Sequence, residues 1–517
     1  MQMCVLLLNY TMKRQRPKQS PQRKPPAALQ LLLFTILLFY QQLSSSTPTS
    51  SAAIPLPLVS AFDFKPDEYN LFRGPAGKNY GNKNGLFTTV TADKYAEIPQ
   101  ATITVPMHYE SGSHHVYVYV GSPNPQRQTL ILDTGSRFMA FPCFPCKGCG
   151  RHHSEFYYND TQSTTHRDNI QPGCFFSSNS PKEISKGSDN SNKDDSQDID
   201  NDNACIFQQT YLEGSSWTAK EVEDFIWLAG DDFEESVEEY MNHLAIPFVF
   251  GCQTEVTGYF SSQFADGILG MAKQGDPHSL IQTMVRAKAI DRAAFAMCLS
   301  KTGGTLSFGG SGLARPDSRA LEYKQQYHIE PMYFSRVSQD HGLYSLEIYE
   351  VWVGPYCITC EDTPDQRANM AHARIMTAFH SGKGTLLDSG TTDSYFPSAA
   401  EDVFKEIWEK LVGSPLESQN KYTYEEFKTM PEVTVIFSPN ATLKIPAESY
   451  MEGVPIDKNA SHSNAVLPWE DSIDLTIRLY MEETQGAVLG VNAMYNYEVL
   501  YDLQENRIGF ARANCGK

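Results

Sequence analysis

Short runs of alternating apolar and polar residues dominate the chain from about residue 101 onward. The segment 101–109 reads ATITVPMHY, and the segment 114–136 reads HHVYVYVGSPNPQRQTLILDTGS. In the second segment an alternating run enters a Gly/Pro/Asn turn and another apolar run leaves it, which predicts a β-hairpin. Further strand-like runs include IPFVFGC, ADGILGMA, AAFAMCLS, GTLSFGG, YSLEIYEVWVG, VTVIFSP, GAVLGVN and NYEVLYDLQENRIGFA.

Helical periodicity is much rarer. The segment 399–413, AAEDVFKEIWEKLVG, spaces its apolar residues as an amphipathic helix does and ends on Gly413. Glycine is common just beyond a helix C-terminus, so this segment predicts one helix with a defined end. The whole pattern predicts a mostly β protein.

Two stretches break the strand pattern. Residues 177–203 contain almost nothing apolar, which predicts a disordered surface insertion; a functional acidic patch is the less favoured alternative. Residues 47–100 are rich in Pro, Gly, Asn and other polar residues, which predicts a linker or a short pro-segment.

The N-terminal segment 1–46 has the layout of a secretory signal. Basic residues precede the apolar run 27–39, and small residues follow it. The run is shorter than the roughly 20 residues that a membrane span needs. We therefore expect a signal peptide, or an uncleaved signal anchor, and no other stable membrane span.

The charge balance narrows the classes of partner. The 517 residues include 42 basic and 61 acidic ones, a formal net charge of −19. Six basic residues and no acidic ones lie in 1–60, so the remainder carries 36 basic against 61 acidic residues, a net charge of −25. Such a surface argues against nucleic acid and anionic membranes as partners.

One motif occurs twice. LILDTGS at 130–136 and TLLDSGTT at 385–392 both run from apolar residues into Asp, a hydroxyl residue and Gly. Each is followed later by an apolar-apolar-Gly run, at 268–270 and at 488–490. A single Asp-Thr-Gly is only an ordinary turn signal, but this paired arrangement indicates two diverged copies of one lobe.

The repeat suggests acid–base chemistry. If the two copies are related by a pseudo-twofold axis, Asp133 and Asp388 meet across it. Two carboxylates a few ångströms apart do not both ionise cheaply, so they share one proton. One carboxylate is then the base that activates a water molecule, and the other is the acid. This chemistry requires no metal and no cofactor.

The residues beside each Asp suit this task. Gly135 and Gly390 allow tight turns that bring backbone N–H groups near the carboxylates. Hydroxyl side chains can lock the two loops together or bond the outer carboxylate oxygens, and these are Thr134, Ser136, Ser389 and Thr391.

These motifs resemble those of pepsin-type (family A1) aspartic endopeptidases, in which two Asp side chains share a proton in this way. The resemblance extends from about residue 101 to the C-terminus. It implies an all-β, bilobal double β-barrel with pseudo-twofold symmetry and an active-site cleft between the lobes. The expected lobes are 101–310, with a cysteine-rich segment at 143–205, and 311–517.

The family also carries a β-hairpin flap with a Tyr-x-x-Gly-Ser pattern. TYLEGSSW places Tyr211, Gly214 and Ser215 in that pattern, so the resemblance implies that Tyr211 covers the cleft and helps to hold substrate. Many members have a Trp seven residues after the first Asp, but Ala140 stands there in this chain. This difference affects the expected geometry of the flap and of the adjoining substrate pocket.

The cysteines refine the resemblance. The cluster Cys143, Cys146 and Cys149 resembles that of nepenthesin-type plant proteases and of the plasmepsin V branch. With His152 and His153 nearby it is compatible with a zinc site, but an exported chain favours disulfides with two further cysteines, Cys174 and Cys205.

Other cysteines suggest further bridges. A Cys298–Cys515 bridge is implied by the resemblance, and Cys357 and Cys360 form either a local disulfide or a redox pair, with the structural bridge favoured. Cys252 has no assigned partner.

The remaining expectations concern processing and location. Glycosylation sequons lie at Asn159, Asn440 and Asn459, of which Asn440 after a turn-forming Pro is the best acceptor. We expect a monomer that acts on polypeptide substrates in the secretory pathway. Its destination is the cell exterior or a vacuole-like or lysosome-like compartment, with retention in the ER or Golgi as the alternative.

Three functions compete at this stage. The leading one is an aspartic endopeptidase (hydrolase). The second is a catalytically inactive relative that serves as a binding or inhibitor protein. The third is a disulfide-rich adhesion or structural protein, which would leave the matched Asp motifs without a purpose.

Overall fold

The computed structural model describes residues 103–516 except 155, 169–174, 177–204, 212, 230–244, 274–278, 311–321, 324–327, 339–341, 361–365, 438–440 and 455–471. The expected signal segment, the linker or pro-segment 47–100 and the insertion 177–203 lie outside the described residues.

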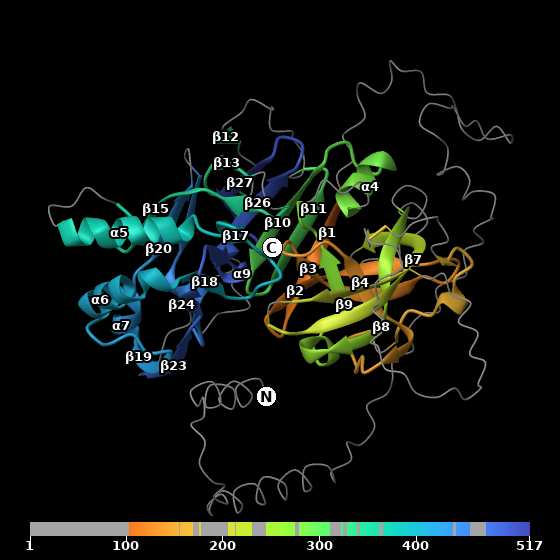
Figure 1. Ribbon diagram of the computed structural model, residues 1–517, viewed down its shortest axis with the longest axis horizontal. Coiled ribbons are helices and arrows are strands. Elements are labelled where there is room, and N and C mark those ends of the chain that lie inside the picture. The colour runs from red at the N-terminus through yellow and green to blue at the C-terminus, as the bar shows by residue number, and fades with distance from the viewer. Residues whose placement is uncertain are drawn as a thin grey trace, which may run out of the picture. The chain divides into compact units, whose positions relative to one another are not determined.

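Strands dominate the described part of the chain, as the alternating pattern predicts (Figure 1). The strands of the first half are β1 (Ile103–Glu110), β2 (Ser113–Val120), β3 (Gln126–Asp133), β4 (Met139–Lys147), β5 (Arg167–Asp168), β6 (Ile206–Thr210), β7 (Ser216–Ala229), β8 (Ile246–Thr257), β9 (Gly267–Gly270), β10 (Ala294–Ser300) and β11 (Gly303–Phe308).

The second half continues with shorter strands. They are β12 (Glu322–Tyr323), β13 (Met332–Arg336), β14 (Ser345–Leu346), β15 (Ile348–Val353), β16 (Tyr356–Cys357), β17 (Thr385–Leu387), β18 (Ser394–Pro397), β19 (Gln419–Thr423), β20 (Val433–Phe437), β21 (Ala441–Ile445), β22 (Met451–Glu452), β23 (Ser472–Ile477), β24 (Leu479–Glu483), β25 (Ala487–Leu489), β26 (Tyr497–Asp502) and β27 (Arg507–Arg512).

Helices connect the strands. The α-helices are α4 (Leu280–Arg286), α5 (Gln366–Phe379), α6 (Glu401–Val412), α7 (Tyr424–Thr429), α8 (Ala447–Tyr450) and α9 (Val491–Met494), and the 3-10 turns are η3 (Asp160–Gln162), η4 (Gly258–Ser261) and η5 (Ser398–Ala400). Within the described ranges, no helix has both the length and the apolar character that crossing a membrane requires.

The first predicted elements are confirmed. β1 buries Ile103, Val105 and Met107 and exposes the residues between them, which is the alternation read from the sequence. β2 and β3 form the expected antiparallel hairpin, with Val116 opposite Leu130. The predicted helix is α6, and Gly413 ends it with a left-handed φ of 84°.

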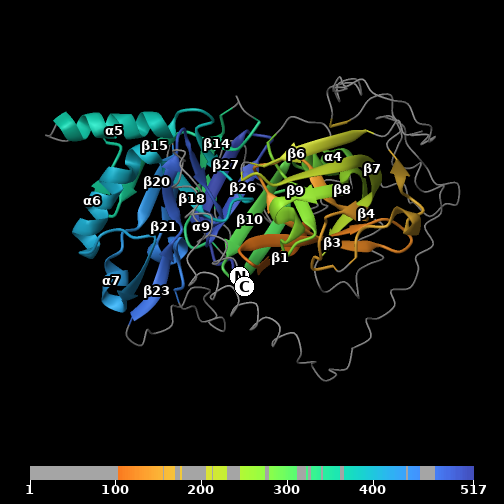
Figure 2. The ribbon, with the colours of Figure 1, turned by 60° about the horizontal axis from the view of Figure 1, so that its bottom comes forward.

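Strands from both halves of the chain join in one large sheet. Its order is β12-β13-β27-β26-β10-β11-β1-β2-β3-β9-β4-β8-β7-β5, with β6 paired to β7. The last strands, β26 and β27, therefore lie inside the sheet, between β10 and β13, rather than at an edge. Both views show β26 close to β10 (Figures 1 and 2). Within the described residues, three smaller sheets are built from second-half strands.

Each Asp motif enters its turn from a strand with a parallel neighbour. β3 pairs with β9, and β17 pairs with β25, so each apolar-apolar-Gly run lies directly beside the strand that carries an Asp. Parallel strands run in the same direction, so each Asp strand and its apolar-apolar-Gly partner end at the same edge of the sheet. The relation between motif and partner run that the sequence suggests is thus the same in both halves.

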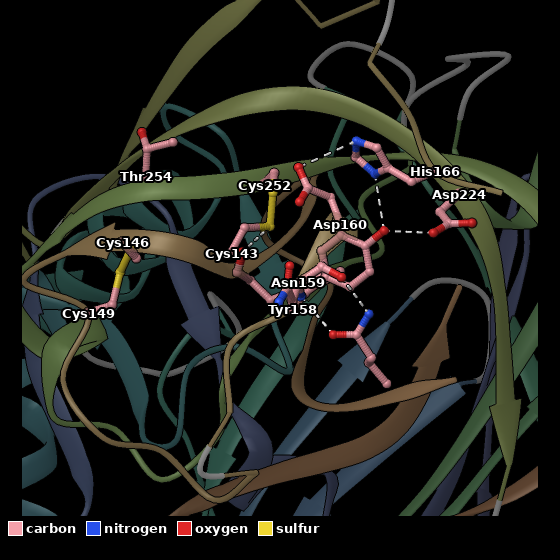
Figure 3. The surroundings of a disulfide bond; sticks show 12 residues. Cys143, Cys146, Cys149, Tyr158, Asn159, Asp160, His166, Asp224, Cys252 and Thr254 are labelled. Atoms are coloured by element: carbon pink, nitrogen blue, oxygen red, sulfur yellow. Dashed lines mark hydrogen bonds and ion pairs between the residues drawn. A yellow bond between two sulfur atoms is a disulfide. The ribbon is translucent and has the colours of Figure 1, made fainter. Parts of the chain in front are cut away.

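The cysteine-rich segment corrects one expectation. Cys143 bonds to Cys252 and Cys146 bonds to Cys149, so these three cysteines do not pair with Cys174 or Cys205 (Figure 3). The cause is tertiary: β4 runs parallel to β8 and brings the Cα atoms of Cys143 and Cys252 to 5.3 Å. Cys205 is disulfide-bonded as well, and Cys174 lies outside the described residues.

The other two expected bridges are present. Cys298 on β10 bonds to Cys515 after β27, across a sequence separation of 217. Cys357 bonds to Cys360, which gives the local structural bridge rather than two free thiols.

Behind the Cys143–Cys252 bridge lies a buried polar network. Tyr158 Oη donates to Asp224 Oδ2 at 2.6 Å and contacts His166 Nδ1 at 3.1 Å (Figure 3). Asn159 begins η3 and accepts at its Oδ1 from Thr161 N at 3.1 Å and from Thr161 Oγ1 at 2.8 Å. The sequon at Asn159 therefore forms the N-terminal cap of η3. The other two sequons, Asn440 and Asn459, lie outside the described residues.

Candidate active site

The two Asp residues lie at corresponding points of the fold. Asp133 is the last residue of β3, and Asp388 directly follows β17. The backbone of the partner run holds each loop: Met271 N donates to Asp133 O at 2.7 Å, and Asp388 N donates to Leu489 O at 3.0 Å. Because each loop is hydrogen-bonded to a parallel neighbouring strand, the positions of both carboxylates are set by β-structure rather than by free loops.

Reciprocal hydrogen bonds join the two loops. Thr134 N donates to Ser389 Oγ at 3.1 Å, and Ser389 N donates to Thr134 Oγ1 at 2.9 Å. The hydroxyls in turn donate to backbone oxygens of the opposite strand, Thr134 Oγ1 to Leu387 O at 3.0 Å and Ser389 Oγ to Leu132 O at 2.8 Å. Four buried bonds with near-twofold symmetry therefore join sites 255 residues apart.

The carboxylates receive bonds from their own turns. Gly135 N donates to Asp133 Oδ1 at 2.8 Å, and Gly390 N donates to Asp388 Oδ1 at 2.9 Å. Thr391 Oγ1 donates to Asp388 Oδ2 at 2.6 Å. Ser136 lies near enough to Asp133 to lower its pKa, but Ser136 Oγ makes no hydrogen bond of good geometry within the described residues.

Each glycine lies against the carboxylate of the opposite loop. A Cβ added at Gly135 would come within 2.8 Å of Asp388 Oδ1, and one added at Gly390 would collide with Asp133 Oδ1. Any side chain at either position would push the carboxylates apart. Close approach, rather than a left-handed backbone, is therefore why both positions need glycine.

The pair cannot be doubly ionised at low cost. Burial, and next the charge of Asp388, raise the pKa of Asp133 well above its ordinary value of 3.8. Asp133 is 4% exposed, whereas Asp388 is half-buried. The two carboxylates therefore share a proton, with the Asp133 side more strongly protonated.

A hairpin brings Tyr211 to the same place. The turn between β6 and β7 is closed by Tyr211 N donating to Ser215 O at 2.9 Å and Gly214 N donating to Tyr211 O at 3.0 Å. Gly214 has a left-handed φ of 93°, and Ser215 Oγ accepts from Tyr259 N at 2.9 Å. Burial, and next the charge of Asp133, raise the pKa of Tyr211. The phenol thus lies close to the carboxylate.

Two residues near the site were not singled out from the sequence. Trp217, on β7, is 1% exposed and packs in one cluster with Ala140 and Phe207. Tyr501, on β26, is fully buried near Thr134. Both are ordinary strand aromatics in the sequence, so no local pattern marks them.

The zinc site considered for the cysteine cluster has no free thiolate ligands. The sulfurs of Cys143, Cys146 and Cys149 are all in disulfides, and His152 directs its ring nitrogens at the backbone oxygens of Cys149 and Gln263. Elsewhere in the described residues, the potential ligand atoms of Glu350, Cys357 and Cys360 lie within 4.8 Å of one another. The two sulfurs of that group are bonded together, so they offer no thiolate.

The chain is similar in sequence to several known proteins. A family model described as "Xylanase inhibitor N-terminal" matches residues 114–310. Aspartic protease 5 of Toxoplasma gondii is 30% identical over 210 residues, which cover 38% of this chain and 20% of that protein.

Two further relatives match over more of the chain. Plasmepsin V of Plasmodium falciparum is 23% identical over 454 residues, which cover 77% of this chain and 69% of that protein. Aspartyl protease family protein 1 of Arabidopsis thaliana is 24% identical over 408 residues, which cover 78% of this chain and 67% of that protein.

Proposed function

Because this chain belongs to the pepsin-like aspartic protease family, with plasmepsin V and plant aspartyl proteases as distant homologues, we propose that it is an aspartic endopeptidase. Its substrates are polypeptides, and its catalytic residues are Asp133 and Asp388. The observation that carries the proposal is the reciprocal bonding of Thr134 and Ser389, which holds two carboxylates against each other's glycine turn.

The hydrogen bonds suggest a role for each carboxylate. Asp388 accepts hydrogen bonds from Gly390 N and Thr391 Oγ1. Asp133 has a raised pKa, because it is buried and faces Asp388. Asp388 is therefore the base in the starting state, and Asp133 carries the proton.

Hydrolysis follows from these protonation states. Asp388 takes a proton from a water molecule while the water oxygen bonds to the scissile carbonyl carbon. The proton of Asp133 passes to the carbonyl oxygen, which gives a neutral tetrahedral diol. The C–N bond then breaks as the leaving nitrogen takes the proton from Asp388. A diol hydroxyl returns its proton to Asp133 as the C=O bond re-forms, which gives the amine, the carboxylic acid and the dyad in its starting state. Atoms balance with water as the only co-reactant.

We propose that the two halves form the two lobes of a pepsin-like double barrel, 101–310 and 311–517. The support is the repeated arrangement of Asp strand and parallel apolar-Gly strand in each half. The cleft between such lobes would hold an extended peptide, and the hairpin that carries Tyr211 would cover it.

A second candidate is a catalytically inactive binding or inhibitor protein. It is kept because the family model that matches residues 114–310 is named for an inhibitor. Both Asp residues, both glycines and the hydroxyls that link the loops are intact, and this set favours the enzyme.

Substitution of the dyad separates the two candidates. Cleavage of a broad peptide library is measured from about pH 3 to 7, with and without pepstatin. We expect Asp133→Asn and Asp388→Asn each to lower the rate by about 10²–10⁴-fold, because each removes acid–base catalysis. Asp402→Asn, on the exposed face of α6, is the matched control and should retain activity.

Two results would count against the endopeptidase. Activity that survives either dyad substitution would exclude this mechanism. A correctly processed wild type that cleaves nothing, yet binds a protein partner, would favour the inhibitor candidate. Resistance to pepstatin alone decides neither, because it reports only the fit of one inhibitor.

We also propose that the protein is a monomer that enters the secretory pathway and carries N-linked glycans. The disulfides Cys143–Cys252 and Cys298–Cys515 suit an oxidising compartment. Residues 47–100 would act as a pro-segment if one of their basic side chains pairs with the dyad at neutral pH. N-terminal sequencing of the secreted protein locates both cleavage points, and tagged protein reveals the compartment.

A further inference from the structure

Three buried polar atoms near Asp133 have no hydrogen-bond partner within the described residues. They are Ser136 Oγ, Tyr211 Oη and Trp217 Nε1. Trp217 is 1% exposed and Ser136 is 7% exposed, so bulk water does not satisfy them. Buried polar atoms in native proteins are nearly always paired. Three such atoms around one carboxylate therefore need a common explanation.

These atoms converge on one another. Burial raises the pKa of Tyr211, and the charge of Asp133 adds to that rise. Trp217 and Ser136 both act in the opposite direction, as groups within reach of the phenol oxygen do. Ser136 also lies close enough to Asp133 to lower the pKa of that carboxyl. Tyr211 also packs against the buried cluster that contains Trp217. Trp217 and Ser136 thus both lie near the phenol, and Ser136 lies near Asp133 as well.

The hydrogen-bonding capacities of the side chains fit this arrangement. An indole N–H only donates, whereas a phenol or a serine hydroxyl both donates and accepts. Trp217 Nε1 can donate to Tyr211 Oη, Tyr211 Oη to Ser136 Oγ, and Ser136 Oγ to the Asp133 carboxylate. Every donor then has an acceptor, and the chain ends on the ionisable group.

Trp217 reaches this position from the hairpin itself. It lies on β7 opposite Gln209 of β6, and its indole meets the ring of Phe207 edge-on at 5.3 Å between centroids. Phe138, two residues after Ser136, meets the same indole at 6.3 Å. The indole is therefore held in a cluster of aromatic rings, in which Phe138 and Phe207 also contact each other at 5.2 Å.

The space beside Ala140 is already filled. A Cβ added at Gly251 would lie 3.0 Å from the tip of Phe207 and 3.1 Å from the Cβ of Ala140, so that ring tip and Ala140 flank the same point. An indole at position 140 would compete with Phe207 for room. Many pepsin-like enzymes have Trp at this position. Here the residue is the small Ala140, because the ring of Phe207 occupies the space beside it.

We propose that Trp217 is the positioning residue for Tyr211: its indole N–H donates to the phenol, and Ser136 links the phenol to Asp133, so that a tryptophan on the flap hairpin replaces the one absent at Ala140. The inference rests on the proposed endopeptidase function, since holding Tyr211 over the dyad matters only if a peptide is bound and cleaved there. Trp217 touches neither substrate nor reacting atoms, and it acts through Tyr211.

The chain contains a matched control. Trp227 lies ten residues further along β7, is also 1% exposed, and also has a buried Nε1 without a hydrogen-bond partner within the described residues. It stacks on Tyr119 at 5.7 Å and belongs to a different part of the sheet. Trp217→Phe and Trp227→Phe are therefore the same substitution in the same strand. The first lies near the candidate dyad, and the second lies far from it.

Kinetics is the first test. We expect Trp217→Phe to lower kcat/KM by about tenfold, the equivalent of roughly 1.4 kcal/mol in the transition state, while Trp227→Phe leaves it unchanged. The combined Trp217→Phe/Tyr211→Phe variant should lose little more than Tyr211→Phe alone, because both changes break one chain. Equal kcat/KM for the two tryptophan variants, or fully additive losses, would overturn the inference.

A second measurement needs neither activity nor the Trp217→Phe variant. With ¹⁵N-labelled tryptophan, the indole N–H signals of Trp217 and Trp227 are assigned in the full chain and followed in Tyr211→Phe. We expect the Trp217 signal to shift and its hydrogen exchange to accelerate, with the Trp227 signal unchanged. An unmoved Trp217 signal would overturn the inference.

The two measurements separate the two proposals. A wild type without peptidase activity counts against the endopeptidase function, and the indole signals then decide alone whether Trp217 bonds to Tyr211. An active wild type with an unmoved Trp217 signal retains the proposed function and removes the role of Trp217.

Discussion

Ser136 shows how one hydroxyl can adjust the protonation of the candidate dyad. Asp133 has its pKa raised by burial and by Asp388, and Ser136 and Gly135 oppose that rise. Asp388 instead receives its bonds from Gly390 and Thr391. The two carboxylates therefore differ in environment although their loops are near copies, and the difference decides which one holds the proton.

Removal of the Ser136 hydroxyl should move the alkaline limit of activity. The acid form of Asp133 is lost as pH rises through its raised pKa. Ser136→Ala removes a group that lowers this pKa, so we expect the alkaline limb of the kcat/KM profile to shift to higher pH. A pH–rate profile of both proteins measures the shift, and an unchanged or acid-shifted limb would contradict it.

Within the candidate site, the two Asp residues and their glycines are the part that the sequence predicts best. Asp133, Asp388 and their glycines lie in short motifs whose chemistry is local. Trp217 was not found, because a tryptophan in a β-strand is by default a core residue. Its proposed role depends on Tyr211, earlier on the same hairpin, and on Ser136, which only the fold brings near Tyr211.

At the scale of elements, the junction of the two Asp loops is the feature that matters most. Thr134 and Ser389 each use backbone and side chain to bond across the junction, and both are buried. Such bonds exclude water and allow only one relative placement of β3 and β17. The junction is therefore both a structural contact and the device that sets the distance between the carboxylates.

Loss of one hydroxyl should weaken that junction measurably. Ser389→Ala leaves Thr134 N without its acceptor and removes the donor to Leu132 O. We expect a loss of about 1–3 kcal/mol in the free energy of unfolding, because buried polar groups become unpaired. Denaturant unfolding measures it, with the exposed Ser418→Ala as control. Equal stability of the two variants would contradict the expectation.

Elements were predicted unevenly. The hairpin β2–β3 and the helix α6 had strong local patterns, and the structure confirms them. Helix α5 had no convincing pattern and was not predicted. The pairing expected for Cys143, Cys146 and Cys149 was wrong, because the partner of Cys143 is decided by the parallel pairing of β4 with β8.

At the scale of the whole molecule, buried histidines link stability to pH. His114 and His115 on β2 are each 2% exposed. Burial lowers the pKa of both imidazoles to about 4. For His115 the neighbouring histidines, His108, His153 and His114, lower the pKa further. For His114 the backbone hydrogen bonds with Ser300 and Gly303 partly oppose the decrease. Because the folded state favours neutral rings, their contribution is lost as pH falls from about 6.5 towards about 4.

The melting temperature should follow this linkage. We expect Tm to fall between about pH 6.5 and 4, and to fall less steeply in His115→Phe, which keeps the aromatic contact with Phe264. The two proteins should melt alike near pH 7.5. Asp133 acts in the opposite direction above its ordinary pKa of 3.8, so comparison of the two proteins isolates the histidine part. Parallel Tm profiles would contradict the assignment.

The sequence by itself determined the mostly β class, the two Asp motifs and the resemblance to pepsin-type aspartic proteases, because these depend on local periodicity and short spacing. Only the tertiary structure decided which strands are neighbours, how Cys143 pairs with Cys252 and how Phe207 and Trp217 come to pack beside Ala140. Those contacts join residues far apart in the chain, and their energies arise from packing and burial that no single segment encodes.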